Sequence, residues 1–454
     1  MIGIFLNASS QDRSISMTSI PQLSRTLRKL LFVEANQLAA QAGVIQRQRV
    51  FSGASLLQLL VFGWLKHPQA GPSQLARFAG SLGLKLSKQA VEERFTRLTA
   101  DWLLAVLQRG VQLLVCAEAV SIPLLQRFTA VLVEDGSTIS LPASLKQVWR
   151  GCGGSASAAA LKLTVRLDLL RGSLSGPYVQ EGRRHETQSP LREQHMPAGS
   201  LWIGDLGYFA LTWLTQLVKQ SVYFLMGYKE PVVMWNAAGE QVEVLDLLPT
   251  DGSEMVDIPV TLGARKQLQA RLIAKQMSEA VVKRRREQLK AQAHKQCKPI
   301  NPRQWELVQW AIVLTNVPAS MLAASEAMAL LRARWQIELL WKLWKDQGQL
   351  DEWQTQNPQR ILCELYAKLL GMLVQHWLLL LCCWDDPHRS LVGAVQVIRD
   401  QVPTLVHGLT GHLPLGQALH LISDALKGGC SIPKRQTRLS TSHRLLEPLG
   451  PGLP

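Results

Sequence analysis

The apolar residues of this chain change their spacing at Phe128, and this change constrains the fold more than any other feature. Before it, residues 20–125 repeat with the spacing of amphipathic helices. Helical spacing returns from about residue 321 and continues to residue 427. Between these regions, strands are predicted at residues 128–135, 161–169, 201–205, 221–226 and 310–315, with 161–169 alternating as a half-exposed strand should. The order predicts an α/β fold with helices before and after the sheet.

The segment from residue 227 to residue 309 differs from its surroundings. It contains short strand-like pieces followed by a basic helical stretch, and it separates two strands of the expected sheet. We therefore treat it as an insertion. The predicted organisation is a flexible N-terminus (1–20), a helical N-terminal domain (21–126), the first part of the α/β core (127–226), the insertion domain (227–309), the second part of the core (310–355), a C-terminal helical region (356–427) and a disordered tail (428–454).

The charge of the chain is strongly positive. There are 49 Lys and Arg against 34 Asp and Glu, a formal net charge of +15 and a pI near 9.7. Such a balance is typical of proteins that meet nucleic acid or an anionic membrane, although solubility alone is the simpler explanation. Between Arg265 and Arg303 lie twelve Lys and Arg and two acids, which is the concentration expected of a phosphate-contacting element.

Cysteine usage and hydropathy indicate a cytoplasmic protein. The seven cysteines are scattered, with no Cys-x-x-Cys pair, and are expected to be reduced core thiols. No signal peptide is evident at the N-terminus. The longest apolar stretch, residues 369–384, contains Gln375 and His376 and is short for a membrane span, so a buried helix is expected.

One helical stretch places two cations and a carboxylate together. Arg334, Glu338 and Lys345 follow one another at steps of 4 and 7 residues, which brings them to a single face of an α-helix. A carboxylate between two cations suits a site that handles a polyanion, such as DNA, at a metal ion.

Three acids are candidate metal ligands because of their positions. Asp135 ends a strand before a Gly-Ser-Thr turn, Asp205 ends another strand, and Glu338 lies on the helix. Three such carboxylates can hold two Mg²⁺ ions for an in-line phosphoryl displacement. Taken singly, each has a simpler reading as a turn residue or as a partner of Arg334 or Lys342. Asp168, in the middle of an alternating strand, is expected to be a surface charge.

The N-terminal helices contain a possible helix-turn-helix. Residues 73–80 and 87–95 are two helical pieces joined by a short Gly-containing link, and Ser87 suits the N-cap of the second. Plain helical bundles contain such pairs as well. If this pair reads DNA, the candidate contacts are Lys88, Gln89 and Arg94.

Three short blocks resemble a known family. Asp135-Gly-Ser-Thr, Gly-Asp205-Leu-Gly-Tyr and Arg334-x3-Glu338-x6-Lys345 are similar to the conserved blocks of DDE transposases, in particular bacterial insertion sequence family four with its Y-R-E-K signature. The acids are separated by 70 and then 133 residues, and the longer gap is where such transposases carry a β-rich insertion domain. The resemblance covers roughly residues 20–425.

The resemblance implies an RNase H-like catalytic core. Asp135, Asp205 and Glu338 would hold two Mg²⁺ ions, with Mn²⁺ as a substitute. Arg334 and Lys345 would hold phosphates of the transposon end, and Lys342 is a further candidate DNA contact. Trp310 matches the insertion-domain tryptophan that stacks a flipped base, with a core aromatic at a strand start as the alternative.

The implied activity is cut-and-paste transposition. Two protomers would bind terminal inverted repeats and pair the ends as a homodimer, with residues 358–427 as the expected dimerisation region. The chain would be nucleoid-associated, with no membrane partner. Two positions depart from the family, because Leu331 replaces the signature Tyr and Leu206 replaces an Arg.

Two alternatives stay open. A catalytically decayed, transposase-derived DNA-binding protein would have lost an acid, and none is lost. A stand-alone nuclease would need neither the basic insertion nor the N-terminal helices. A membrane protein fits least, because charged residues interrupt nearly every apolar segment.

Overall fold

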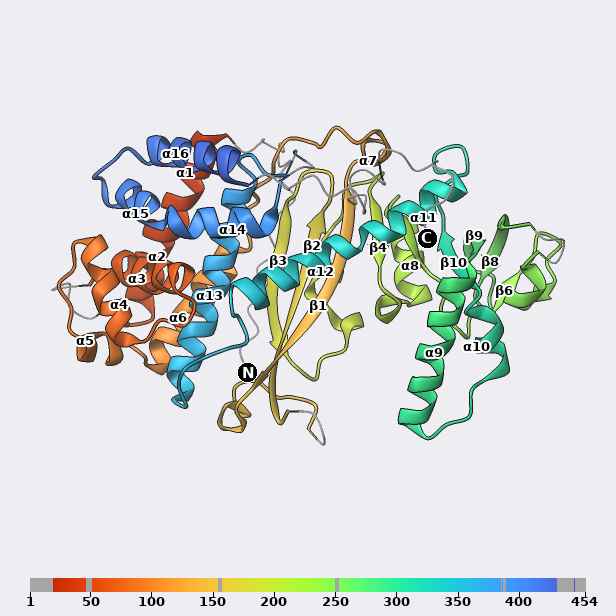
Figure 1. Ribbon diagram of the computed structural model, residues 1–454, viewed down its shortest axis with the longest axis horizontal. Helices are drawn as coiled ribbons and strands as arrows, with labels where there is room; N and C mark the ends of the chain where they lie inside the picture. The colour runs from red at the N-terminus through yellow and green to blue at the C-terminus, as the bar shows by residue number, and fades with distance from the viewer. Residues whose placement is uncertain are drawn as a thin grey trace.

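The computed structural model describes residues 19–45, 51–153, 157–249, 253–384, 386, 389–430 and 445. Within them, ten strands form one mixed sheet in the order β3-β2-β1-β4-β5-β10-β9-β8-β6-β7 (Figure 1). The strands are β1 (Val131–Leu141), β2 (Ala159–Asp168), β3 (Leu174–Glu181), β4 (Leu201–Gly204), β5 (Tyr223–Gly227), β6 (Met234–Trp235), β7 (Gln241–Val242), β8 (Met255–Leu262), β9 (Leu268–Gln276) and β10 (Trp310–Thr315). The expected mixed α/β class, with helices before and after the sheet, is confirmed.

The sheet changes character at β1. On one side β2 and β3 pair antiparallel, and on the other β4 and β5 run parallel to β1. Next to β5, β10 pairs antiparallel and passes the sheet on to β9. The strands between residues 227 and 309 therefore extend the same sheet instead of forming a separate one.

Helices cover both faces of the sheet and form an all-helical lobe at one end (Figure 1). Before the sheet are α1 (Ile20–Arg28), α2 (Ala35–Gln41), α3 (Gly53–Lys66), α4 (Pro72–Ala79), α5 (Lys88–Glu92), α6 (Arg97–Gly110) and α7 (Pro123–Gln126); within it are α8 (Leu211–Lys219), α9 (Glu279–Gln296) and α10 (Pro302–Leu307). After it are α11 (Ala324–Ala333), α12 (Trp335–Lys342), the π-helical turn η8 (Leu343–Gln347), α13 (Pro358–Leu379), α14 (Leu391–Asp400), α15 (Val402–Thr410) and α16 (Leu415–Gly429).

The N-terminal and C-terminal helices share one core. Helix α13 packs between α3 and α6, and α1 packs on α16, so the red helix α1 and the blue helix α16 lie together in Figure 1. Every α13 residue from Arg360 to Leu379 is buried. This confirms the buried helix expected within residues 369–384, and no helix among the described residues is long and apolar enough to cross a membrane. It also explains the apolar character of α13 by packing within the chain, so that character is no evidence for a dimer interface.

A bidentate ion pair fixes the start of α11. Arg127, just before β1, donates to both carboxylate oxygens of Glu326 at 2.7 and 2.8 Å. Glu326 also accepts from the amide of Ala323 at the helix start, and the Arg127 guanidinium lowers the pKa of the Glu326 carboxyl. The contact ties the helix pair α11–α12 to the beginning of the central strand.

Strand β1 is longer than expected. The prediction of a strand that ends at Asp135 before a turn is wrong, because pairing with β2 continues through Gly136, Ser137 and Thr138 as far as Leu141. Small polar residues resemble a turn in sequence, but here a long partner strand supplies a full ladder of hydrogen bonds.

Strand β2 is buried on both faces, not half-exposed. All but one of its residues are buried, including the polar Thr164, Arg166 and Asp168. The expectation that Asp168 is a surface charge is therefore wrong. Its carboxylate accepts from the amides of Val131 and Leu170, and burial raises the pKa of the Asp168 carboxyl to about 6. Local backbone donors take the place of water around this acid.

The cysteines follow the prediction in part. All seven are free, and five are buried, whereas Cys152 and Cys297 are exposed, so the expectation of core thiols fails for these two. The predicted flexible N-terminus (1–20) and disordered tail (428–454) fall almost wholly outside the described residues. Of them, Ser19 caps α1 with its hydroxyl and residues 428–430 complete the end of α16, where Cys430 is buried.

Candidate active site

Two of the predicted acids meet through the register of the sheet. Val131 and Val133 pair with Leu201 and Ile203 on the parallel strand β4. Continued by two residues, this register sets Asp205 beside Asp135, one strand spacing away. Asp205 follows the last residue of β4 and begins a tight turn, as the sequence predicted.

The third acid reaches the same place from a helix. Helix α12 crosses β1, and Trp341 on this helix donates its indole N–H to Oδ2 of Asp135 at 3.2 Å. Glu338 lies one turn earlier on α12, and its carboxylate accepts from Nη2 of Arg334 at 2.8 Å. The predicted acids are thus brought to one face of the sheet under one helix.

Asp135 lies in an unusual electrostatic position. It is largely buried, and its other oxygen accepts only from the amide of the next residue, Gly136, at 2.8 Å. Burial, with smaller contributions from Asp205 and Glu186, raises the pKa of the Asp135 carboxyl to about 6, although Arg334 opposes the shift. Neighbouring carboxylates that repel each other's charge in this way favour the binding of a cation between them.

Arg334 connects the other two acids. Its guanidinium is 2.8 Å from Glu338 and its Nε is 4.0 Å from Oδ1 of Asp205. It stands between α11 and α12 in helical geometry, so the step of four residues to Glu338 holds as predicted. In this arrangement the guanidinium partly neutralises two of the three carboxylates.

The side-chain positions bear on metal binding in two ways. The donor set consists of carboxylate oxygens, which suits hard cations such as Mg²⁺ or Mn²⁺. In the described part of the chain, however, no three Asp, Glu, His or Cys side chains stand close enough together to hold an ion. Arg334 engages Glu338, and Trp341 engages Asp135. Holding a metal therefore requires these side chains to give up those contacts.

The predicted phosphate contacts of the third block differ in their surroundings. Lys342 is exposed, and its ammonium lies 4.9 Å from the ring centre of Trp335. Lys345 is half-buried in the π-helical turn η8, so its step of seven residues from Glu338 is not the regular α-helical step that was assumed. Trp310 opens β10 and is partly buried against the core on the α8 side of the sheet.

The possible helix-turn-helix has a short second helix. Ser87 caps α5 as predicted, accepting from the amide of Ala90 at 3.1 Å, but α5 has only five residues. Lys88 is exposed, and Gln89 is exposed and donates to Glu93. Arg94 is half-buried and stacks over the ring of Phe51 at 5.2 Å, so part of its side chain serves packing.

Three residues near the acids were missed by the sequence analysis. Glu186 lies against Gly207, where an added Cβ would be 2.0 Å from its carboxylate. Tyr208 is buried with its hydroxyl near Gly136. Trp335 is 46% exposed directly after Arg334. Tyr208 and Trp335 lie inside the sequence blocks that resemble the transposase family, so the sequence could have pointed to them. Glu186 lies outside these blocks and reaches the site only through the fold.

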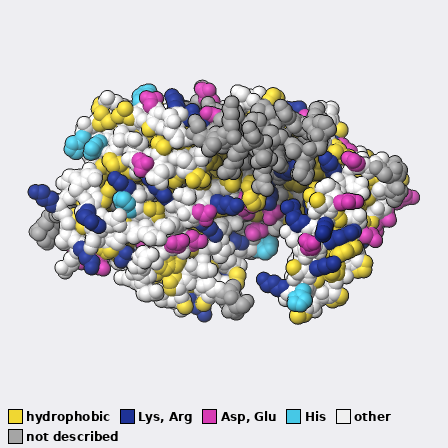
Figure 2. All heavy atoms as spheres, in the orientation of Figure 1, with side chains coloured by type: hydrophobic (Ala, Val, Ile, Leu, Met, Phe, Trp, Pro, Cys, Tyr) yellow, Lys and Arg dark blue, Asp and Glu magenta, His cyan; other side chains and the backbone are white. Residues whose placement is uncertain are grey.

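The basic stretch of the insertion forms the exposed helix α9. None of its residues is buried, and Lys and Arg gather on the surface where Figure 1 places this helix (Figure 2). Arg286 and Lys290 lie over the ring of Trp305 on α10, at 4.8 and 5.4 Å. Arg285 donates to the carbonyl of Trp310 at 2.9 Å, which fixes the helix to the sheet.

Comparison with known proteins finds similarity to transposases. The family model described as "Transposase DDE domain" matches residues 126–374. The transposase for insertion sequence element IS231F of Bacillus thuringiensis subsp. israelensis is 25% identical over 362 residues, 74% of this chain and 75% of that protein. The transposase for insertion sequence element IS1151 of Clostridium perfringens is 23% identical over 378 residues, 78% of this chain and 79% of that protein.

Proposed function

The chain belongs to the transposase DDE domain family, and from this premise we propose that it cuts and rejoins DNA at the ends of an insertion sequence. The family implies an RNase H-like core and DNA transposase activity. The finer proposal is that the chain binds terminal inverted repeats and carries out cut-and-paste transposition in the cytoplasm, at the nucleoid. The meeting of Asp135 and Asp205 through the β1–β4 register, beneath the helix that carries Glu338, is the observation that supports it most.

The three acids are proposed as the ligands of two divalent ions. Asp135, Asp205 and Glu338 would hold Mg²⁺, or Mn²⁺ in its place, through carboxylate oxygens. Bound ions would supply activation of the attacking oxygen and stabilisation of the leaving oxygen. The pKa of Asp135, raised to about 6, leaves this carboxylate ionised for most of the time at neutral pH and ready to bind a cation.

Arg334 has two proposed partners. Without DNA, its guanidinium binds Glu338 and approaches Asp205. A DNA phosphate also offers two acceptor oxygens to a guanidinium, so Arg334 can exchange a carboxylate for a phosphate while keeping charge-assisted hydrogen bonds. Lys345 and Lys342, farther along the same helical segment, would hold neighbouring phosphates.

The remaining DNA contacts are proposed on both sides of the core. Helix α9 presents an unburied, basic surface in the insertion. In the N-terminal helices, Lys88, Gln89 and Arg94 are the candidate contacts, and Trp310 is the candidate platform for an extruded base. A homodimer would pair the two ends, and the exposed apolar side chains of Val392 and Leu421 mark α14 and α16 as surfaces to test.

A decayed DNA-binding protein is the second candidate. It is favoured by Leu206, whose side chain is 42% exposed beside Asp205, where the resembling family carries Arg. Leu331 packs partly against the main core and offers no hydroxyl to a phosphate. These two positions weaken the binding of a DNA end but remove no acid.

The test is cleavage of a duplex that carries the inverted repeats flanking this gene, with Mg²⁺, by the wild type and by Glu338→Gln. We expect wild-type cleavage at the repeat boundary and none by the variant, with similar DNA binding by both. Asp346→Asn, at an exposed acid eight residues farther along in η8, is the matched control and should cleave normally. Cleavage by Glu338→Gln would remove Glu338 from the ligand set, and binding without cleavage by the wild type would favour the decayed protein.

A further inference from the structure

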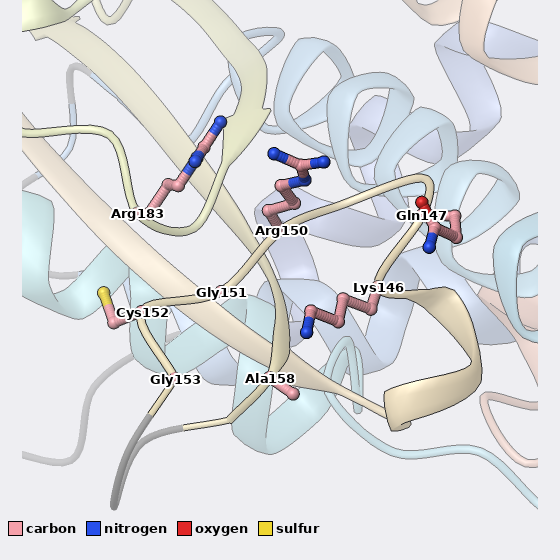
Figure 3. A pocket seen from close by; sticks show the side chains of 8 residues that line it. All are labelled: Lys146, Gln147, Arg150, Gly151, Cys152, Gly153, Ala158 and Arg183. Atoms are coloured by element: carbon pink, nitrogen blue, oxygen red, sulfur yellow. The ribbon is translucent and has the colours of Figure 1, made fainter.

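A basic pocket lies at the far end of the β1–β2 hairpin from the acids. Its volume is about 450 Å³, and it is lined by Lys146, Gln147, Arg150, Gly151, Cys152, Gly153, Ala158 and Arg183 (Figure 3). Lys146 reaches toward Gly151 from one side, and the guanidiniums of Arg150 and Arg183 stand on the other (Figure 3). The pocket takes no part in the site described above.

The lining points to an anion. Its described residues include three cations, no acid and no aromatic ring. Among the described residues, the one carboxylate bonded to a lining cation is that of Glu181, which accepts from Arg183 at 2.7 Å and stands outside the lining. The guanidiniums of Arg150 and Arg183 point to the same side of the loop, with Lys146 on its other side (Figure 3). Positively charged donors of this kind match phosphate oxygens, whereas a lining without aromatic side chains gives a nucleic-acid base nothing to stack on.

The floor of the pocket is held by backbone pairing, so the cations project from a fixed base. The amide of Gly151 donates to Ala158 at 2.9 Å, and the amide of Arg183 donates to Arg150 at 3.3 Å. A Cβ at Gly151 would lie 2.1 Å from the carbonyl of Ser157, so only glycine permits this approach. Trp149, next to Arg150, donates to the hydroxyl of Tyr366 on α13 at 2.7 Å.

The position of the pocket fits one DNA strand that also reaches the acids. Asp135 and Leu141 are six residues apart on β1, and Leu141 pairs with Ala159, next to the pocket residue Ala158. At about 3.4 Å per strand residue the separation is on the order of 20 Å. A DNA strand advances about 3.4 Å per nucleotide, so this distance is roughly six nucleotides.

We propose that this pocket binds a backbone phosphate of the DNA being cut, roughly six nucleotides from the bond that is cleaved. The inference rests on the proposed function and deepens it, because it names a contact outside the three recognised blocks. The contact fixes the position of the DNA along the β1–β2 hairpin and is independent of base sequence, as phosphate contacts are.

The first experiment couples the pocket to a single phosphate. Duplexes of the inverted repeat carry one neutral methylphosphonate at successive positions, and affinity is measured for the wild type and for Lys146→Gln/Arg150→Gln. A methylphosphonate at one position, roughly six nucleotides from the cut, should lower the affinity of the wild type several-fold and leave the affinity of the variant almost unchanged. The matched control, Lys219→Gln/Lys427→Gln, removes equal charge from exposed residues elsewhere and should keep the wild-type profile.

The second experiment uses the exposed thiol of Cys152 as a native probe of the pocket. Its alkylation is followed by mass spectrometry in the full chain, alone, with the end duplex, and with inorganic phosphate or a nucleoside monophosphate. Protection by the duplex and not by the small anions supports the proposal. Equal protection by inorganic phosphate or the mononucleotide would show a small-molecule site and overturn it.

The outcomes separate the pocket from the function. In one outcome, the wild type cleaves the end duplex while every methylphosphonate position lowers the affinity of the wild type and of Lys146→Gln/Arg150→Gln equally. That result overturns the pocket inference alone. Failure of the wild type to bind or cleave any end duplex overturns the proposed function, and the pocket inference with it. In the supporting case, the slope of log affinity against log salt concentration should also fall by about 1 in the pocket variant.

Discussion

Glu134 and Asp135 are neighbours on β1, but their side chains lie on opposite faces of the sheet and differ in their electrostatic surroundings. Glu134 is fully buried, and Arg166 donates to its Oε2 from Nη2 at 2.9 Å. Among the described residues, Asp135 receives only an indole N–H and one amide, and burial raises its pKa to about 6. One strand thus carries an acid with a permanent cation on one face and an acid without a bonded cation on the other.

The difference shows that one internal strand can hold a neutralised acid next to an acid without a bonded cation. Arg166 also donates to the carbonyl of Leu191 at 2.7 Å, so the buried Glu134–Arg166 pair also holds the loop before β4. Charge neutralised in this way stays fixed. On the Asp135 face, no cation is bonded to the carboxylate in the described part of the chain, and under the proposed function a metal ion would take that place.

The largest effect that would sharpen this comparison is on catalysis. Asp135→Asn keeps the shape of the side chain and removes its charge, so we expect DNA cleavage to fall roughly 1,000-fold or more, since a metal ligand supplies several kcal/mol to the transition state. Cleavage of the end duplex is measured beside binding of the same duplex. Cleavage within tenfold of the wild type would mean that the comparison has misplaced the reactive acid.

The next effect tests the other face. Arg166→Met leaves Glu134 buried without its cation, and we expect the free energy of unfolding to fall by about 3 to 5 kcal/mol. Chemical denaturation measures it. Glu134→Gln/Arg166→Met removes both charges and should recover much of the loss. If the double variant were no more stable than Arg166→Met, the pair would not be the cause.

The smallest effect is a gain in stability. The folded pKa of Asp135 lies above its value in the unfolded chain, so the protonated form stabilises the fold and this contribution is lost as pH rises from about 4 through about 6. Asp135→Asn stays neutral, so it should exceed the wild type by about 1 to 3 kcal/mol above pH 6 and match it below pH 4. Denaturation curves across this pH range check the sign, and a gain independent of pH would contradict it.

The sequence predicted those parts of the site that depend on neighbouring residues. The turn after β4, the helix with Glu338 and the strand Trp310–Thr315 each follow from local patterns and occur as expected. The sequence-based prediction failed where contacts with distant segments determine the structure. Gly136 to Thr138 look like a turn until β2 pairs with them, and Asp168 looks exposed until the amide of Val131 reaches it.

Side-chain roles were the hardest to predict. Arg94 is of a residue type that commonly contacts DNA, but its side chain also covers Phe51, which lies more than forty positions earlier in the chain. Glu186 belongs to no recognised block and reaches Gly207 only because two short turns pack together. The roles of Arg94 and Glu186 both depend on contacts between segments far apart in sequence, and the spacing of apolar residues gives no information about such contacts.

The burial of α13 between α3 and α6 has a consequence for how the protein is made. The N-terminal helices leave the ribosome long before Pro358–Leu379, so the apolar faces that pack on α13 stay exposed until α13 has been synthesised. A message cut short before α13 would give an unfolded product that proteases clear, instead of a free DNA-binding fragment that competes with the intact enzyme. Proteolysis of a fragment ending at Gln126 would reveal this dependence, because the fragment should be degraded far faster than the full chain.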